Sequence, residues 1–378
     1  MPRRQEQEDA RPEVTEVAPN ILRMELPIRL PGLGHVNCFA ILDENGATVV
    51  DPGLPGPYTW RALQDRLRKA GVAIKHVHTV FVSHSHPDHF GGAARLAKEA
   101  GAEIIAHRSF SFGPPAPAHE HTEASVDDLA VQAEDVGQAE DVGRAEEAGQ
   151  AEEAAEEAER SERSLAPFEN RKTVWGGERP RPPFFTRLKW IAMRYLGGKI
   201  IPTITHPVEH GDVLELAGRE WFVLHTPGHT GDHVCLHDPE NGIFLAGDHV
   251  LPTITPHISG LTSSADPLAS FFYSLDRVAE IPEVKLVLPA HGHPFEDLPG
   301  RCAAIKRHHD ERLDKIGSIS KGFGRPATVE EFSRKLFKPR SWGSMAESET
   351  YAHLEHLRIA GRAERRIEME GTYRYEAG

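Results

Sequence analysis

Histidine and aspartate residues gather at the ends of short apolar runs, and this pattern constrains the fold of the chain most. The apolar run 77–82 predicts a buried strand, and Ser83-His84-Ser85-His86-Pro87-Asp88-His89 follows it directly. Four groups that can bind a metal ion therefore fall within six residues, on a loop that leaves a sheet. Because backbone turns in such a loop can direct several side chains to one point, the segment predicts a metal site.

Further possible ligands follow three other predicted strands. The runs 221–224, 242–246 and 284–288 are followed by His229, by Asp248, and by His291 and His293. A single histidine among the 23 in the chain would carry little weight, but a cluster with partners at other strand ends predicts metal binding. Imidazole nitrogen and carboxylate oxygen suit zinc, which takes about four ligands and keeps one position open in catalytic sites. The number of donors suits two ions rather than one.

These motifs resemble those of the metallo-β-lactamase superfamily, whose α/β fold is an αββα sandwich with a two-metal centre at one edge. The resemblance implies that His84, His86 and His229 hold the first metal, that Asp88, His89 and His291 hold the second, and that Asp248 bridges them. Asp51, at the end of the run Val49-Val50, matches a supporting aspartate of the family, which orients a ligand through a hydrogen bond. Five separately spaced motifs carry the resemblance, which covers residues 18–300 apart from a central insertion.

The resemblance implies two divalent ions, with zinc favoured by donor type, although iron and manganese accept the same donors. Two ions bridged by Asp248 would lower the pKa of a shared water from about 15.7 to roughly 7, and the resulting hydroxide would be the nucleophile. Asp88 would accept a hydrogen bond from this nucleophile and fix its direction of attack. The sequence names no unambiguous acid for the leaving group. His233 and His293 are candidates, but each suits equally well the role of a hydrogen-bond partner beside the ligands.

The leaving group separates two functions. A thiolate has a conjugate-acid pKa near 8.5 and needs little protonation, whereas an alkoxide leaves far more readily with an acid. We therefore expect an acyl thioester or related small ester as substrate, as in the glyoxalase II-like and acyl-thioesterase relatives. Members that destroy antibiotics generally carry Cys where Asp248 stands, which argues against that activity. The ligand types alone leave a mononuclear iron persulfide dioxygenase open. The main alternative is a metal-dependent endoribonuclease or nucleic-acid-binding phosphodiesterase, with Arg187, Lys189 and Arg194 guiding a polyanion.

A central insertion, residues 114–183, separates the two groups of motifs. Its segment 120–163 holds 16 Asp or Glu residues against 3 Arg, so nearly all of the net charge of −14 lies there and says nothing about the substrate. The six-residue repeat that begins at Gln132 matches no helical face, and its low apolar content predicts disorder. Residues 184–196 predict an amphipathic helix, which either packs on the sandwich or caps the substrate cleft.

The N-terminal residues 1–17 are polar and are expected to be flexible. No apolar stretch typical of a secretory signal is visible there, and the amphipathic segment 184–196 is too short and too charged to span a bilayer. A cytoplasmic location without membrane attachment is therefore expected. Cys38, Cys235 and Cys302 are widely spaced, which indicates neither a disulfide framework nor a thiolate metal site.

From residue 301 the pattern changes to predicted helices at 301–319, 328–337 and 348–360, followed by a hairpin at 365–375. This order resembles the winged-helix tail of one subgroup of the superfamily. Residues 301–378 hold 16 Lys or Arg against 12 Asp or Glu, a net charge of only +4, and the third helix opens beside Glu347 and Glu349. Such a face is a poor one to offer to phosphates. We therefore favour structural packing or a homodimer contact over nucleic-acid binding for this tail.

Overall fold

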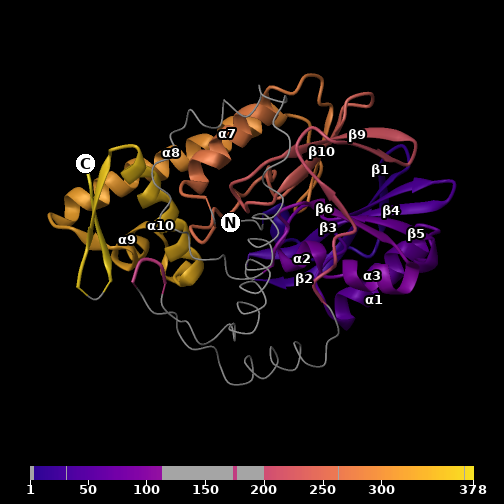
Figure 1. The fold of residues 1–378 in the computed structure, drawn as a ribbon, viewed down its shortest axis with the longest axis horizontal. Coiled ribbons are helices and arrows are strands. Elements are labelled where there is room, and N and C mark those ends of the chain that lie inside the picture. The colour runs from indigo at the N-terminus through magenta and orange to yellow at the C-terminus, as the bar shows by residue number, and fades with distance from the viewer. Residues whose placement is uncertain (1–3, 31, 113–172, 177–199, 263, 370) are drawn as a thin grey trace, which may run out of the picture.

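The computed structural model of the protein describes residues 4–30, 32–112, 173–176, 200–262, 264–369 and 371–378. Two β-sheets stack on each other, helices cover their outer faces, and a smaller helical unit follows at the C-terminal end (Figure 1). This arrangement confirms the α/β sandwich with an αββα layer order that the sequence predicts.

The first sheet contains seven strands in the order in which they occur along the chain. They are β1 (Val14–Ala18), β2 (Ile21–Leu30), β3 (Leu33–Asp43), β4 (Gly46–Val50), β5 (Val77–Phe81), β6 (Glu103–His107) and β7 (His206–Val208). Neighbours pair antiparallel from β1 to β4 and parallel from β4 to β7. Because parallel strands end at the same edge of a sheet, the loops that leave β4 and β5 lie side by side.

The second sheet contains five strands in the order β12-β11-β10-β9-β8. They are β8 (Val213–Leu216), β9 (Arg219–His225), β10 (Val234–Asp238), β11 (Ile243–Gly247) and β12 (Leu286–Pro289). The edge strand β8 alternates exposed and buried residues, whereas every residue of β10 and β11 is buried between the layers. The runs that predicted strands at 77–82, 221–224, 242–246 and 284–288 thus form strands with slightly shifted bounds.

Three hydrophobic layers hold the sandwich together. Between the sheets lie residues such as Phe39 and Trp221, which come from opposite sheets and are almost completely buried. Helices α1 (Pro57–Lys69) and α3 (Ala93–Ala100) pack on the outer face of the first sheet. Helix α7 (Pro267–Ala279) packs on the second sheet and begins where the Asp266 carboxylate accepts a hydrogen bond from the Ala269 amide at 2.9 Å.

The C-terminal unit begins with α8 and continues through a small sheet. Its elements are α8 (Leu298–Phe323), β13 (Ala327–Thr328), α9 (Val329–Leu336), η3 (Pro339–Ser341), α10 (Ser344–Ile359), β14 (Ala363–Ile367) and β15 (Tyr373–Ala377). The three strands lie in the order β13-β15-β14. All three helices and the hairpin expected from the sequence are present, whereas the two-residue strand β13 was too short to predict. The resemblance to a winged helix stays a prediction.

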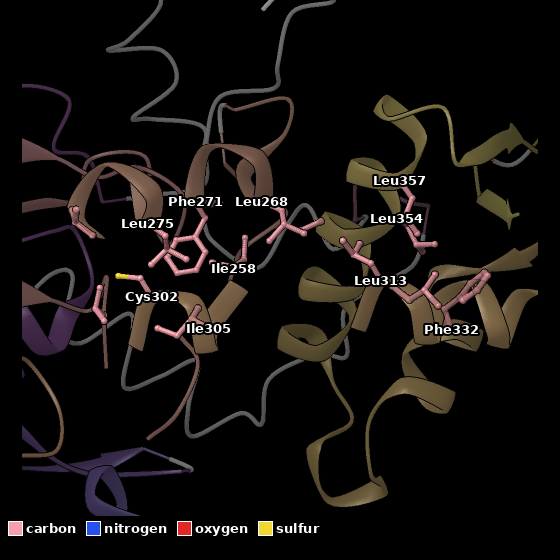
Figure 2. Close-up of a cluster of buried hydrophobic side chains, with 14 of the residues drawn as sticks. Ile258, Leu268, Phe271, Leu275, Cys302, Ile305, Leu313, Phe332, Leu354 and Leu357 are labelled. Carbon is pink, nitrogen blue, oxygen red and sulfur yellow. The ribbon is translucent and has the colours of Figure 1, made fainter. Parts of the chain in front are cut away.

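A continuous hydrophobic core joins the C-terminal unit to the sandwich. Figure 2 shows Ile305 of α8 beside Phe271 of α7, and Leu313 of the same helix beside Phe332 and Leu354. The predicted boundary between residues 300 and 301 therefore falls inside α8, which begins at Leu298. The change in sequence pattern marks the end of the ligand-bearing loops but not an independent core.

The described part of the N-terminal segment begins at Arg4. It forms the 3-10 helix η1 (Gln5–Gln7) before strand β1 pairs with β2. The Glu6 side chain is completely buried, and its carboxylate accepts a hydrogen bond from the Thr253 amide at 2.7 Å. Backbone donors of a distant loop thus satisfy a buried charge in this polar segment.

The acidic repeat 120–163 and the predicted helix 184–196 lie outside the described residues. The described stretch 173–176 of the predicted insertion packs on the C-terminal unit. Trp175 is buried with its ring centroid 5.2 Å from that of Tyr351, and its carbonyl oxygen accepts a hydrogen bond from the Tyr373 amide at 3.0 Å. Within the described ranges, no helix has the length and apolar character needed to cross a membrane.

Candidate metal centre

The loops that follow five strands bring the expected residues together at one edge of the sandwich. These residues are Asp51 after β4, His84, His86, Asp88 and His89 after β5, His229 after β9, Asp248 after β11 and His291 after β12. Asp88 and His89 lie on the short helix α2 (Pro87–Phe90), which Pro87 begins. Strand ends on both sheets thus supply donors to a single region.

The first group of donors contains His84, His86, His229 and Asp248, whose candidate ligand atoms all lie within 4.8 Å of one another. The Nε2 atom of His229 is 3.5 Å from Oδ2 of Asp248 and 3.0 Å from Nδ1 of His86. The Nε2 atom of His84 is 4.0 Å from Oδ2 of Asp248. Three imidazoles therefore surround one carboxylate.

The second group contains Asp88, His89 and His291, again with candidate ligand atoms within 4.8 Å of one another. The Oδ2 atom of Asp88 is 3.7 Å from Nε2 of His89 and 3.6 Å from Nε2 of His291. Asp248 also reaches this group, because its Oδ2 is 3.6 Å from His89 Nε2 and its Oδ1 is 3.4 Å from His291 Nε2. Asp248 therefore lies between the two groups.

The geometry of both groups fits divalent metal ions. Zinc bonds of about 2.0–2.1 Å in a tetrahedral site place neighbouring ligand atoms roughly 3.3 Å apart, close to the spacings between these side chains. Within the described part of the chain, Nε2 of His84, His89 and His291 and Oδ1 of Asp248 are buried without a hydrogen-bond partner. Buried polar atoms without partners are costly, and a bound cation would satisfy all four. The side chains present could therefore hold metal ions.

The remaining ring nitrogens of the histidines are held by hydrogen bonds. His229 Nδ1 lies 2.7 Å from the carbonyl oxygen of His257, and His291 Nδ1 lies 2.6 Å from that of His35. A carbonyl oxygen accepts, so Nδ1 carries the proton and Nε2 keeps its lone pair for a cation. This pattern is typical of histidines that bind metals. The sequence did not reveal His35 or His257, because both contribute a backbone carbonyl, which leaves no side-chain signal.

Asp51 supports the second group without joining it. Its Oδ2 lies 2.8 Å from Nδ1 of His89 and accepts a hydrogen bond from the Ser83 hydroxyl at 2.7 Å, while its Oδ1 accepts one from the Ser83 amide at 2.8 Å. Asp51 adopts a φ of 50°, in the left-handed region where Asp and Asn are tolerated better than most residues. Its carboxylate thereby orients His89 and the start of the His84 loop.

The two other histidines considered in the sequence have different positions. His233 Nε2 accepts a hydrogen bond from the Asp248 amide at 3.0 Å, and His233 Nδ1 lies 2.8 Å from the Thr226 hydroxyl, so both ring nitrogens are engaged. His293 is turned toward the N-terminal part of the chain, with Arg23 and Glu8 each 3.2 Å from its ring nitrogens. His233 therefore helps to hold Asp248, whereas His293 lies in a separate polar cluster.

Burial and neighbouring charges shift the pKa values in the site in opposite directions. Burial, reinforced by His89 and His86, lowers the pKa of His84 well below its usual range, which keeps it in the neutral form that binds metals. Burial alone would also lower the pKa of His89, but the carboxylates of Asp248 and Asp51 raise it well above that range. For Asp248, His291 and His89 outweigh burial and hold its pKa well below the usual value. The site thus concentrates negative charge between the imidazoles.

A four-layer sandwich with these donor loops at one edge defines a class of metal-dependent hydrolases. The sequence model of the metallo-beta-lactamase superfamily matches residues 31–291, which is more than half of the chain. The chain therefore belongs to the metallo-β-lactamase superfamily, as its motifs predict.

Curated relatives match a shorter stretch. The chain is 38% identical over 106 residues to a hydroxyacylglutathione hydrolase of Maricaulis maris, and this match covers 28% of the chain and 39% of the relative. It is 33% identical over 114 residues to a lactamase-like protein of Aspergillus fumigatus, covering 30% of the chain and 32% of that relative. It is 30% identical over 111 residues to the Drosophila melanogaster homolog of beta-lactamase-like protein 2, and this match covers 29% of the chain and 35% of that relative. The chain thus spans less than half the length of these relatives.

Two solved structures resemble the whole chain. A metallo-beta-lactamase family protein from Thermus thermophilus superposes with a TM-score of 0.66 at 24% identity, covering 96% of this chain and all of that one. A beta-lactamase domain protein from Burkholderia ambifaria gives a TM-score of 0.66 at 22% identity, covering 97% of this chain and 95% of that one. At this level of identity the likeness concerns the fold alone.

Proposed function

We propose that the protein is a dinuclear metal-dependent hydrolase that acts on an acyl thioester or a related small ester. The observation that carries this proposal is the position of Asp248, which lies 3.4–4.0 Å from histidines of both donor groups. One buried carboxylate between two sets of imidazoles suits two cations, because a buried negative charge is costly unless positive charge compensates it. Zinc is the proposed metal because the donors are nitrogen and oxygen, although iron or manganese would accept them.

The side chains of the site would divide the work as follows. When bound, two divalent ions lower the pKa of a coordinated water to roughly 7 and polarise a carbonyl oxygen. His84, His86 and His229 would hold one ion, Asp88, His89 and His291 the other, and Asp248 would bridge them. The carboxylate of Asp88 has a second role in this proposal, because it can accept a hydrogen bond and direct the attacking oxygen. Asp51 and His233 keep His89 and Asp248 in position.

The surroundings of the site favour a leaving group that needs no acid. His233 is hydrogen-bonded at both ring nitrogens, and His293 is paired with Arg23 and Glu8 away from the ligand side chains. Both histidines considered as proton donors are therefore occupied. A thiolate, with a conjugate-acid pKa near 8.5, leaves without protonation more easily than an alkoxide. The similarity to a relative named for the hydrolysis of hydroxyacylglutathione, a thioester, supports the same substrate class.

The alternative function is a metal-dependent endoribonuclease or phosphodiesterase. The sequence of the C-terminal unit resembles that of a winged helix, a module that in other proteins binds nucleic acid, and this resemblance is what supports the alternative. However, the buried residues of α10 include Ser348, Glu349, His353 and Glu355. Because this helix turns much of its polar surface inward, we favour a packing role for the C-terminal unit. A homodimer contact through it stays a prediction.

A substrate panel tests the proposal. Acyl-CoA, a glutathione thioester, a lactone and single-stranded RNA would be offered to protein of measured metal content at about 50 and about 200 mM salt. We expect thiol release from a thioester at a rate that hardly changes with salt. RNA cleavage without thiol release, with affinity falling by orders of magnitude at the higher salt, would instead establish the alternative.

A further inference from the structure

We propose that Glu349, on α10 of the C-terminal unit, is a positioning residue for the metal centre. It holds the side chain of His257, and the carbonyl oxygen of His257 in turn fixes the ring of His229. The inference rests on the proposed function, because it assigns a role toward metal ions bound by His229 and its neighbours. It would make the C-terminal unit a part of the metal-binding machinery.

The link begins at the ring of His229. Its Nδ1 donates a hydrogen bond to the His257 carbonyl oxygen at 2.7 Å, so Nε2, which lies 3.0 Å from His86 Nδ1 and 3.5 Å from Asp248 Oδ2, keeps its lone pair for a cation. The partner of the second ring nitrogen sets both the tautomer and the orientation of a ligand histidine. A displacement of the His257 backbone would therefore turn a metal-binding nitrogen.

The loop that carries His257 is fastened to α10 at several points. His257 Nδ1 lies 3.4 Å from Oε2 of Glu349, and the Gly260 amide donates a hydrogen bond to the Ser348 hydroxyl at 3.0 Å. A Cβ atom added at Gly260 would lie 2.7 Å from the Ser348 carbonyl oxygen, so the loop and the helix approach as closely as a glycine allows. Between these contacts Ile258 is fully buried in the core shared with the C-terminal unit (Figure 2). Helix α10 therefore determines where the His257 carbonyl oxygen lies.

Glu349 is itself fixed by a cation. Arg312 of α8 donates from Nη1 to Oε1 of Glu349, and both side chains are largely buried. Burial alone would raise the pKa of Glu349, but His257 and Arg312 hold it well below its usual range, so the group stays a carboxylate. A buried carboxylate between a guanidinium and an imidazole is a rigid anchor, because removing it leaves Arg312 without its partner.

Two nearby histidines complete this network without forming a second metal centre. His353 Nδ1 donates to the Glu349 carbonyl oxygen at 2.7 Å, and His309 Nδ1 lies 3.0 Å from His353 Nε2. His309, His353 and Glu349 are close enough to hold an ion. However, Arg312 already pairs with the carboxylate, and the hydrogen bond between the rings occupies His309 Nδ1 and His353 Nε2, which leaves only His309 Nε2 without a partner. We therefore assign them to holding α10 against α8.

The test compares Glu349→Gln with Glu355→Gln. Both glutamates lie on α10, both are buried and both pair with arginines, but Glu355 bonds Arg365 and the Tyr375 hydroxyl rather than the His257 loop. Zinc affinities measured by chelator competition on the full chain would be compared with melting temperatures. We expect Glu349→Gln to lower the affinity for one of the two zinc equivalents by roughly 10- to 100-fold. Glu355→Gln should lower the melting temperature and leave both affinities unchanged.

A second variant approaches the same contact from the loop. His257→Ala keeps the carbonyl oxygen but removes the ring that Glu349 holds, and it should reproduce the loss of zinc affinity even if Glu349→Gln folds poorly. Unchanged affinity in this variant, or an equal loss in Glu355→Gln, would overturn the inference. Wild-type protein that binds zinc but releases no thiol from any thioester would instead overturn the proposed substrate class, and the comparison between variants would stand. A third zinc equivalent lost with Glu349 would make it a ligand and also overturn the inference.

Discussion

Each histidine of the site has two ring nitrogens, and the structure gives the two different tasks. In His229 and His291 the nitrogen that faces the donor groups is Nε2, whereas Nδ1 donates to a backbone carbonyl oxygen. In His89 the corresponding Nδ1 meets the Asp51 carboxylate. A ligand that is oriented in advance loses little freedom when it binds a cation, so in the proposed metal centre these hydrogen bonds would contribute to metal affinity.

Asp51→Asn separates this orienting role from the backbone conformation. Asn tolerates the left-handed φ of 50° at this position as Asp does, but it removes the negative charge that faces His89. We expect metal affinity to fall by about 10- to 100-fold while the melting temperature of the metal-free protein changes little. Isothermal titration with zinc measures the first quantity, and affinity equal to that of the wild type would refute the orienting role.

Asp248→Ala should have a larger effect, because it removes the carboxylate shared by both donor groups. We expect the metal content to fall to about one equivalent or less, and hydrolysis to lose several kcal/mol of transition-state stabilisation, about 10³-fold in kcat/KM. Asp238→Ala is the matched control, since Asp238 is also buried but pairs with Arg219 rather than with the donor groups. Two metal equivalents and full turnover in Asp248→Ala would reject the bridging assignment.

At the scale of elements, the strand ends were predictable and the contacts behind them were not. The runs before His84, His229, Asp248 and His291 are short, apolar and followed by donors, so they predict both the strands and a shared edge. The carbonyl groups of His35 and His257 are invisible in sequence, because any residue offers the same oxygen. Their positions depend on long-range packing, such as the contact of the His257 loop with α10.

The histidines between α8 and α10 predict a pH-dependent stability. Burial lowers the pKa of His353 from 6.5 to about 4, and the nearby Arg312 adds to this shift. Burial also lowers the pKa of His309 to about 2, and the His353 ring adds to it. Below pH 6.5 the unfolded chain therefore binds protons that the folded protein does not. The stability that these groups contribute is present above this pH and is lost as the pH falls through the range from 6.5 to 4 and below.

Urea unfolding at about pH 7 and about pH 5 measures this effect. As the pH falls through this range, each buried neutral histidine lowers the free energy of unfolding by up to about 1.4 kcal/mol per pH unit. The double variant His309→Leu and His353→Leu should show a shallower fall of the unfolding free energy than the wild type. Since the histidines of the metal site are present in both proteins, their contribution cancels in the comparison. If the free energy of unfolding fell equally with pH in both proteins, His309 and His353 would not be the source of the pH dependence.

At the scale of the whole molecule, one hydrophobic core runs from the second sheet through α8 into the C-terminal unit. The sequence predicted two separate units, because the change from strands to helices is visible while the continuity of α8 across residue 300 is not. The packing of Trp175 was likewise not predictable from the sequence pattern. It lies in a predicted low-complexity insertion, yet it is 3% exposed and packs in this core.

Deleting residues 120–163 should therefore leave folding and catalysis largely intact, provided that residues 173–176 are kept. The composition of the segment gives it little apolar surface to bury. By contrast, Trp175→Ala in the full chain should lower the unfolding free energy by about 3–5 kcal/mol, because it empties a buried site. Thermal unfolding of both variants tests this contrast. A collapse of the melting temperature in the deletion variant would contradict the assignment of the repeat as dispensable.

We propose that seven side chains from loops of both sheets hold two metal ions and that these ions enable thioester hydrolysis. The most direct measurement is the rate of thiol release by metal-free protein as zinc is added in known amounts. We predict almost no release at the start, a rise with added zinc, and a plateau near about two equivalents per chain. Thiol release that is equally fast without metal, or that never appears at any zinc content, would contradict the proposed metal-dependent thioester hydrolysis.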